Sequence, residues 1–335
     1  MYLEKRIDLL VGLGEYCLSG APVWEATKQR AHAHNGWFIP EFIEEAVRQI
    51  VRNFLQRDAL AVWAKRYDLP DRQATPRTVG LIMAGNIPLV GFHDLLSVFL
   101  SGHRQLIKPS GRDEVLIRHL VERLVAMDPG VAEWIGFAER LNGCDAYIAT
   151  GSNNSARYFD YYFGKYPHLI RRNRTSVAIL TGEETRDELE ALADDVNLYF
   201  GLGCRNVTQI AVPANYDFIP LLEVFKKYEY LADLAKYRHN YDYQLTLLIL
   251  NKKYYMTNGS ILLAENASPF SPISVLHYVY YPKGEIPALP EASGEIQCVV
   301  GRGHIPFGQA QQPGLTDYAD GVDTMEFLRI FKGGF

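Results

Sequence analysis

One cysteine stands among residues that could make its sulfur a nucleophile. Cys204 follows Gly201 and Gly203 and directly precedes a cation, Arg205. Glycines let a substrate and backbone N–H groups approach closely, and a nearby cation stabilises the thiolate, which is the reactive form of the thiol. The stretch therefore indicates a cysteine that can form a covalent intermediate. The alternative is a small buried hydrophobic residue, as most unpaired cysteines are.

Three further polar groups follow short apolar runs. Residues 85–88 read Gly-Asn-Ile-Pro, residues 108–110 read Lys-Pro-Ser, and residues 150–152 read Thr-Gly-Ser. In open α/β sheets, ligands bind beyond the carboxyl ends of parallel strands, so these turns are candidate ligand contacts. No GxGxxG follows any of the runs, and the usual dinucleotide fingerprint is absent. Each of these three sequences alone is also common in loops that have no binding role.

The apolar pattern divides the chain into segments that must position these groups. Residues 1–70 read as helices, with Pro40 suited to the first turn of one of them, and residues 70–76 read as a linker. From residue 78, strands expected at 79–83, 105–107, 146–149 and 176–181 alternate with helices expected at 88–100, 114–127, 156–163 and 186–199. This alternation predicts a parallel sheet with crossover helices.

The later part of the chain is expected to be helical at first and then to return to strands. Residues 217–250 read as helical and rich in tyrosine, and strands are expected at 275–281 and 296–300. The tyrosines suit a packed, hydrogen-bonded core, with a tunnel for an acyl or aromatic group as the alternative.

Composition favours a globular protein that has no general attraction to polyanions. The 335 residues include 22% charged and 48% hydrophobic residues, with a net charge of −5, so neither nucleic acid nor an anionic membrane is an expected partner. The four cysteines form no CxxC pair, and neither a metal site nor a disulfide scaffold is expected. No stretch reaches the length of an apolar membrane span. We expect a soluble, cytoplasmic protein.

Taken in order, the motifs resemble those of the aldehyde dehydrogenase superfamily, and within it the acyl-CoA reductase branch typified by the fatty-acid reductase of bacterial bioluminescence. Residues 85–88 are similar to the family's Trp-Asn-Phe-Pro, whose asparagine amide helps bind the oxyanion. Residues 106–110 are similar to the strand whose lysine contacts the adenosine ribose, and 150–152 to the turn near the cofactor pyrophosphate. Residues 201–204 match the nucleophile motif Gly-Gln-x-Cys. Residues 270–273 and 306–308 are similar to two late segments.

The resemblance implies an α/β fold with two parallel-sheet domains and a role for each candidate residue. The implied boundaries are a helical N-terminal segment at 1–75, a Rossmann-like dinucleotide-binding domain at 76–180, a catalytic domain at 181–308 and a C-terminal arm at 309–335. The implied catalytic pair is Cys204 and Asn86. The implied cofactor contacts are Lys108, Ser110, Thr150, Gly151 and Ser152.

Two departures from the family pattern bear on the reaction. Residues 171–175 read Arg-Arg-Asn-Arg-Thr where hydrolytic relatives carry Glu-Leu-Gly-Gly-Lys. Without that carboxylate the chain lacks the base that activates water, which suits exchange of an acyl group with coenzyme A or a carrier thiol. Ser268 stands where relatives hold the nicotinamide ribose with a glutamate, and this leaves an inactive member of the family as an alternative.

The resemblance therefore implies NAD(P)H-dependent reduction of an acyl thioester to an aldehyde through an acyl group on Cys204. Gly111 stands where NAD-preferring relatives often carry a glutamate, and Arg112 adds a cation. This exchange favours the 2′-phosphate of NADPH, with NADH as the alternative, in which case Arg112 only decorates a helix start. The rival functions are an aldehyde-oxidising dehydrogenase and a non-catalytic subunit that binds acyl chains or a partner.

The remaining expectations concern partners and nearby charged groups. The expected partners are an acyl-CoA or acyl-carrier substrate and either a second copy of the chain or a partner enzyme. Arg171, Arg172 and Arg174 are expected to form a solvated or salt-bridged surface, with binding of coenzyme A phosphates or of an acidic carrier as the alternative. His93 and His304 are available as proton donors, but lone histidines are commonly structural, and neither is placed in the catalytic set.

Overall fold

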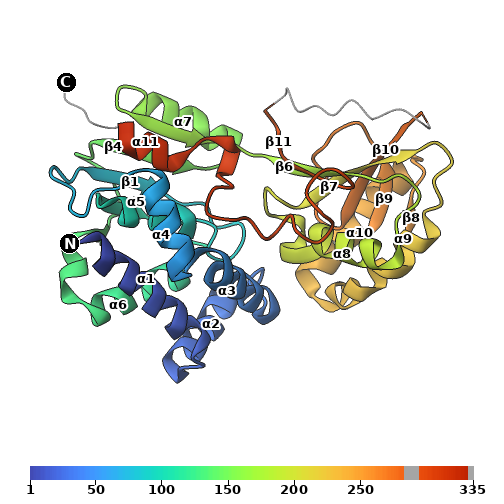
Figure 1. Cartoon of the computed structure of the whole chain (residues 1–335). Coiled ribbons are helices and arrows are strands. Elements are labelled where there is room, and N and C mark those ends of the chain that lie inside the picture. The colour runs from blue at the N-terminus through green and yellow to red at the C-terminus, as the bar shows by residue number, and fades with distance from the viewer. Residues whose placement is uncertain (283–293, 331–335) are drawn as a thin grey trace. The chain divides into compact units, whose positions relative to one another are not determined.

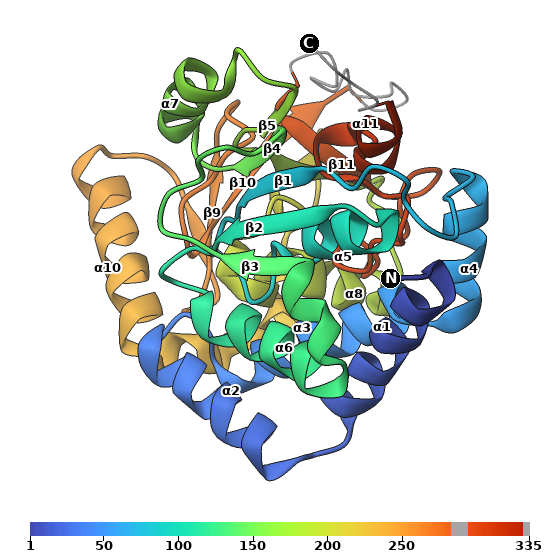
Figure 2. The same cartoon turned by 90° about the vertical axis from the view of Figure 1, so that its left-hand side faces the viewer.

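Five parallel strands form the sheet of the first half of the chain. The computed structural model describes residues 1–282 and 294–330, and in it the strands follow the order β3-β2-β1-β4-β5 (Figure 2). Ile82, at the end of β1, pairs with Lys108 on one side and Ala149 on the other. The carboxyl ends of these strands therefore meet along one edge. The strands are β1 (Thr78–Ile82), β2 (Arg104–Lys108), β3 (Ile135–Phe137), β4 (Ala146–Thr150) and β5 (His168–Arg171).

Helices surround this sheet, and four of them precede its first strand. They are α1 (Leu3–Leu18), α2 (Pro22–His34), α3 (Pro40–Phe54), α4 (Arg57–Arg66), α5 (Phe92–Ser101), α6 (Glu114–Met127) and α7 (Asn153–Phe163). Helix α3 begins at Pro40 as expected. Helix α5 begins at Phe92 instead of residue 88, because Leu89 adopts a left-handed φ of 57° that a helix excludes.

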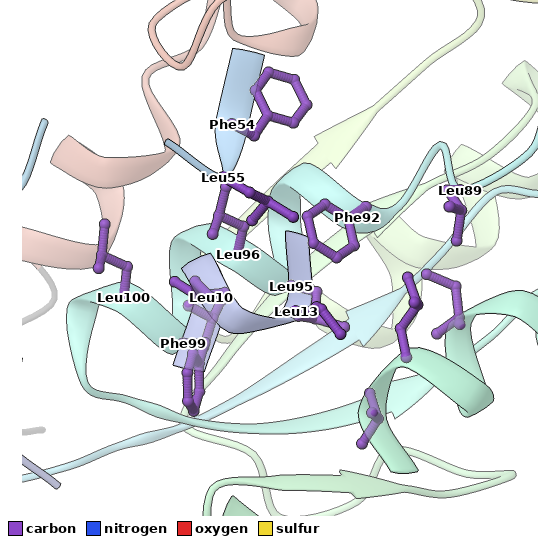
Figure 3. Close-up of a cluster of buried hydrophobic side chains, with 14 of the residues drawn as sticks. Leu10, Leu13, Phe54, Leu55, Leu89, Phe92, Leu95, Leu96, Phe99 and Leu100 are labelled. Atoms are coloured by element: carbon purple, nitrogen blue, oxygen red, sulfur yellow. The ribbon is translucent and has the colours of Figure 1, made fainter. Parts of the chain in front are cut away.

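The N-terminal helices and the sheet share one hydrophobic core. Every residue of helix α5 except His93 is buried, and the helix packs against β1, β2 and α1. Figure 3 shows the α1 residues Leu10 and Leu13 grouped with Phe92, Leu95 and other side chains of α5. All four are at most 1% exposed. The helical N-terminal segment is thus part of the same packed body as the first sheet.

The chain returns to this body near its C-terminus. Contacts divide the chain into two units: one is Met1–Asn173 with the segment from Pro313 onward, and the other is Arg174–Gln312 (Figure 1). Trp63 donates a hydrogen bond to the Tyr318 hydroxyl at 3.0 Å, and helix α11 (Thr324–Ile330) packs on α5. Most of the expected C-terminal arm is therefore a structural part of the first unit. Residues 331–335 of that arm lie outside the described residues.

The second unit holds a six-stranded sheet in the order β11-β6-β7-β10-β9-β8. All pairs are parallel except the one between β8 and β9. The strands are β6 (Thr175–Ile179), β7 (Val207–Pro213), β8 (Met256–Thr257), β9 (Leu262–Glu265), β10 (Val275–Tyr281) and β11 (Ile296–Val300), and the helices are α8 (Arg186–Asn197), α9 (Ile219–Val224) and α10 (Ala235–Leu250).

Strand β6 belongs to the second unit, whereas the expected domain boundary at residue 180 places it in the first domain. This strand pairs with β7 and β11, so it belongs to the second sheet, and the division between units falls between Asn173 and Arg174. Its apolar run predicts a strand without indicating which sheet the strand joins. Among the described residues, no helix is both long and apolar enough to cross a membrane.

Candidate active site

A left-handed turn leads from α8 to Cys204. Helix α8 begins with a capping box between Thr185 and Glu188 and ends at Asn197, after which Tyr199, Phe200 and Gly201 have φ values of 55°, 58° and 72°. Left-handed residues other than glycine are uncommon, and they persist where the surrounding structure imposes them, often at functional sites. Two in succession before Gly201 make this turn the most unusual backbone near the candidate nucleophile.

Cys204 is partly exposed at the end of this turn, whereas Cys17 and Cys144 are buried. Burial raises the pKa of Cys17 to about 12 and also raises the pKa of Cys144. Cys298 is partly exposed as a residue, but burial of its thiol raises its pKa as well. These three thiols are therefore protonated at neutral pH, which makes them poor nucleophiles.

Arg205 acts on a thiol that the sequence pattern did not single out. The sequence pattern predicts that its cation stabilises the thiolate of Cys204, and this stays a prediction. In the structure, its charge and a hydrogen bond from its side chain lower the pKa of Cys298, against the larger effect of burial. Cys298 thus lies within reach of the residue that follows the candidate nucleophile.

Ser176 connects three segments around Cys204. Its side chain is fully buried, and its hydroxyl donates a hydrogen bond to the backbone carbonyl of Cys204 at 3.0 Å. The same oxygen accepts the backbone N–H of Cys298 at 3.2 Å. Strand β6, the nucleophile turn and strand β11 are therefore held together at one hydroxyl.

In the first unit, the turn that carries Asn86 packs closely on the turn after β2. A Cβ added to Gly85 would lie 2.5 Å from the Ser110 hydroxyl, so the close approach requires glycine there. Asp113 accepts the backbone N–H of Leu89 at 2.7 Å, which holds the far end of the same turn. Asn86 itself is half-buried.

The other candidate cofactor residues lie at the carboxyl edge of the same sheet. Lys108 ends β2 and is exposed, and Thr150 ends β4. Ser152 caps α7, because its hydroxyl accepts the N–H of Ser155 at 3.3 Å. A Cβ on Gly151 would lie 2.9 Å from the Phe159 ring, so this glycine lets the turn pack against α7.

This edge fits a nicotinamide dinucleotide in its chemistry. It offers an exposed ammonium, several hydroxyls and turns closed by glycine, all at the carboxyl ends of parallel strands, where such ligands bind. The exposed side chain of Arg112 makes no hydrogen bond or ion pair with any residue that the structure describes. The described residues include no group of three or more histidine, cysteine or acidic side chains suited to a metal ion.

The basic run at 171–174 is largely engaged within the protein. The guanidinium of Arg171 pairs with buried Asp94 and donates to the Thr324 hydroxyl at 2.7 Å, so it is a structural residue and not a phosphate ligand. Arg172 forms an exposed ion pair with Asp160 at 3.0 Å, and Arg174 donates to a backbone carbonyl. Arg171 therefore forms a salt bridge, but it lies in the interior and not on the expected surface.

His93 is also a structural residue. Its Nε2 lies 3.0 Å from the Leu315 carbonyl, and its ring packs against Phe54, Trp63 and Tyr318. His304, by contrast, is exposed.

Ser268 lies in a turn where its backbone and hydroxyl groups form hydrogen bonds with other residues of the second unit. Its carbonyl accepts hydrogen bonds from Gln209 at 3.1 Å and from His277 at 2.8 Å.

The tyrosine-rich segment mainly stabilises the second unit. The hydroxyl of Tyr237 donates to the Ser260 carbonyl at 2.9 Å, and that of Tyr228 donates to Asp194 at 2.7 Å. These bonds favour the packing interpretation of the tyrosines.

Four buried polar residues near the candidate site were missed by sequence reasoning: Asp113, Ser176, Asp195 and Asn206. The Asp195 carboxylate is fully buried and accepts the N–H groups of Gly308 at 2.7 Å and Ala310 at 3.0 Å. Burial raises the pKa of Asp195 to about 7. For Asp195 the sequence did contain a signal, because this acidic residue stands next to Val196 on the buried side of α8. Charged residues are seldom buried without partners, so such a position indicates a hydrogen-bonded carboxyl group.

Comparison with known proteins identifies a family model and a shared fold. The model of the family described as Acyl-CoA reductase (LuxC) matches residues 25–227, which is more than half of the chain. That range includes all the candidate catalytic and cofactor residues. The chain has no significant sequence match among curated proteins.

Several solved aldehyde dehydrogenases have a similar fold. Aldehyde dehydrogenase 21 from Physcomitrella patens, in complex with the product succinate, matches with a TM-score of 0.63 at 13% identity, over 84% of this chain and 69% of that one. The Mycobacterium tuberculosis aldehyde dehydrogenase complexed with NAD⁺ matches with 0.61 at 13% identity, over 85% and 69%. An NADP-dependent enzyme from E. coli matches with 0.63 at 12% identity, over 89% and 72%. At these identities the likeness concerns the fold.

Proposed function

The chain belongs to the LuxC family of acyl-CoA reductases, and on that premise we propose how its residues divide the reaction. The protein is an oxidoreductase with the aldehyde dehydrogenase fold, and it reduces an acyl thioester to an aldehyde with a nicotinamide cofactor. We assign the covalent step to Cys204. The observation that carries this assignment is a partly exposed cysteine that follows a turn with left-handed residues, in a chain whose other three thiols have raised pKa values.

In the first step the Cys204 thiolate attacks the carbonyl carbon of the thioester. A bond forms between the cysteine sulfur and this carbon, the bond from the carbon to the donor sulfur breaks, and the donor leaves as a thiolate. The acyl group remains on Cys204. The backbone N–H of Cys204 and the side-chain amide of Asn86 are assigned to the oxyanion that develops on the carbonyl oxygen. For Asn86 the support is the match of residues 85–88 to the family motif.

The acyl-cysteine must survive until it is reduced. No carboxylate is present at residues 171–175 to activate water, and Arg171 is held in a buried ion pair with Asp94. When bound, the cofactor supplies the hydride, and release of the aldehyde returns the electron pair of the carbon–sulfur bond to Cys204 as a thiolate. The same lack of a base argues against the rival, an aldehyde-oxidising dehydrogenase.

Lys108, Ser110, Thr150, Gly151 and Ser152 are the residues we assign to the cofactor. NADPH is the proposed form, because residue 111 is glycine and not the glutamate of NAD-preferring relatives, and the Arg112 side chain is exposed. A phosphate bound by arginine is a strong, charge-assisted contact.

Kinetics with the two cofactors test this preference. kcat/KM should be higher with NADPH than with NADH, and Arg112→Gln should lower the NADPH value selectively. Arg118→Gln is a matched control, because Arg118 lies on the following helix and pairs with Glu114 at 3.4 Å. Equal values for the two cofactors in the unchanged protein would contradict the proposal.

Intact-protein mass measurement tests the covalent step. The protein mixed with an acyl-CoA and no cofactor should gain the mass of one acyl group, and Cys204→Ala should gain none. A protein that binds acyl-CoA without gaining mass would support the non-catalytic rival. Oxidation of an aldehyde with no thiol acceptor would support the oxidising rival.

The remaining assignments are coarser. We propose coenzyme A as the acyl donor, with a carrier protein as the alternative, and either a second copy of the chain or a partner enzyme as the macromolecular partner. We propose a cytoplasmic location, because the four cysteines are unpaired and a reducing compartment keeps them so.

A further inference from the structure

Two residues after Cys204, a buried amide side chain uses both of its polar atoms. Asn206 is fully buried, and its Oδ1 accepts the backbone N–H of Gly203 at 2.8 Å. Its Nδ2 donates to the carbonyl of Leu198 at 2.8 Å and to that of Asp195 at 3.0 Å. A buried polar group in a folded protein must find such partners, and here all of them belong to the approach to Cys204.

These two acceptors are carbonyls at the end of α8 and in its C-cap residue, Leu198, and Nδ2 also donates to the Val196 carbonyl at 3.4 Å. The last carbonyls of a helix lack an N–H partner within the helix and must find one elsewhere. Left without a partner, a buried carbonyl costs about 1–3 kcal/mol. The Asn206 amide satisfies the end of the helix and, with its other atom, holds the turn that follows.

The turn needs such support because its backbone is unfavourable. A left-handed conformation costs about 1–2 kcal/mol for a residue other than glycine, and Tyr199 and Phe200 both adopt it. The backbone of Asn206 adds two more bonds: its N–H donates to the Gly203 carbonyl at 3.0 Å, and its carbonyl accepts the N–H of Ser176 at 3.0 Å. Residues 203–206 are thereby closed into a turn that contains Cys204.

We propose that Asn206 is a positioning residue for acyl transfer, which fixes the direction of the Cys204 sulfur and of its backbone N–H. The proposal rests on the role assigned to Cys204 above. Only a side chain with an acceptor and a donor on one short stem meets both demands. Aspartate keeps the acceptor for Gly203 but turns a second oxygen toward the two carbonyls, and serine is too short to reach both sides.

The test compares Asn206→Asp with a matched amide elsewhere in the second unit. Asn258 also organises a turn, because its Oδ1 accepts the N–H of Ser260 at 3.0 Å and its Nδ2 donates to the Leu222 carbonyl at 3.1 Å. It makes none of the bonds around Cys204 described here. Misplacing a reacting group by about 1 Å can cost 10²-fold in rate. We therefore expect Asn206→Asp to lower the rate of acyl-cysteine formation at saturating acyl-CoA by about 10- to 100-fold, while KM changes little, and Asn258→Asp to leave that rate unchanged.

Alkylation of Cys204 by iodoacetamide as a function of pH gives a second readout that does not require acyl transfer. Asn206→Asp should change this pH profile, and Asn258→Asp should not, even if both lower the melting temperature. If the aspartate variant does not fold, the neutral variant Asn206→Ser is measured in its place with the same expectations. A folded Asn206 variant with an unchanged acylation rate and an unchanged alkylation profile would overturn the proposal. A wild-type protein that gains no acyl mass would instead overturn the role of Cys204, and the alkylation profiles would still decide the role of Asn206.

Discussion

The carboxyl group of Asp113 accepts the backbone N–H of Leu89 at 2.7 Å and so joins the start of α6 to the turn that carries Asn86. Leu89 has a left-handed φ of 57°, and its side chain lies in the core of the first unit (Figure 3). Burial raises the pKa of Asp113 well above its ordinary value. Burial therefore favours the neutral, protonated form of the acid that holds this turn.

Two replacements of Asp113 should distinguish the contribution of its hydrogen bond to stability from the contribution of its charge. Asp113→Ala leaves the buried N–H of Leu89 without an acceptor and should lower the free energy of unfolding by about 1–3 kcal/mol. Asp113→Asn resembles the protonated acid and should lower it much less. Chemical denaturation measures both. A loss in the asparagine variant as large as in the alanine variant would mean that the carboxyl is ionised.

Asn86→Ala tests the oxyanion role. Removing one oxyanion donor typically lowers turnover by about 10²- to 10³-fold, and Asn86 is only half-buried, so the variant should fold with a similar melting temperature. Steady-state reduction of acyl-CoA measures the effect. Full activity in the variant would show that the amide makes no contact with the reacting group.

The buried pair of Arg171 and Asp94 should matter for stability. Arg171→Met leaves the Asp94 charge buried without a partner, and we expect a loss of about 3–5 kcal/mol in the free energy of unfolding. Arg172→Met is the control, because its ion pair with Asp160 is exposed and such pairs contribute about 0–1 kcal/mol. A raised KM for acyl-CoA in the Arg172 variant would restore a phosphate role for this part of the run.

Asp195 should make stability depend on pH. Its folded pKa of about 7 lies above the ordinary value of 3.8, so between these values the folded protein binds a proton that the unfolded chain does not. Stability from this group is then greatest at the acidic end and falls as the pH rises, by at most about 1.4 kcal/mol per pH unit.

Thermal unfolding of the unchanged protein and of Asp195→Asn, across the range between these two pKa values, isolates the contribution of Asp195. The difference between the two melting temperatures should change with pH, because only the unchanged protein carries the titrating group. A constant difference would contradict the raised pKa.

Three strands of the first sheet, β1, β2 and β4, could be predicted because each is a short apolar run followed by a polar turn, whereas β3 and β5 were not predicted. The run at 146–149 was predicted and β4 is Ala146–Thr150. The antiparallel strand β8 was not predicted, because its two residues are too few to show an alternating pattern. The expected boundary at residue 180 placed β6 in the wrong sheet. The strand pairs with β7 and β11, which follow later in the chain, so its own sequence does not reveal which sheet it joins.

The motifs of the candidate site could be predicted from the sequence, whereas the residues that hold these motifs in place could not. The glycines and the cation around Cys204 are adjacent in sequence, and their spacing carries chemical meaning. Asn206 acts through backbone carbonyls 8 and 11 residues earlier, and these face it because the chain turns left-handed at Tyr199 and Phe200. No spacing rule describes such a contact, since it depends on the path of the backbone.

The return of the segment after Pro313 to the first unit affects how the protein is made on the ribosome. Tyr318 and α11 cover Trp63 and α5, yet the ribosome adds them only after the entire second unit has been synthesised. Residues 1–173 therefore emerge with apolar surface that stays uncovered during translation of residues 174–312. A nascent chain in that state is a natural substrate for chaperones, and a chain truncated after residue 312 should aggregate where the 335-residue chain does not.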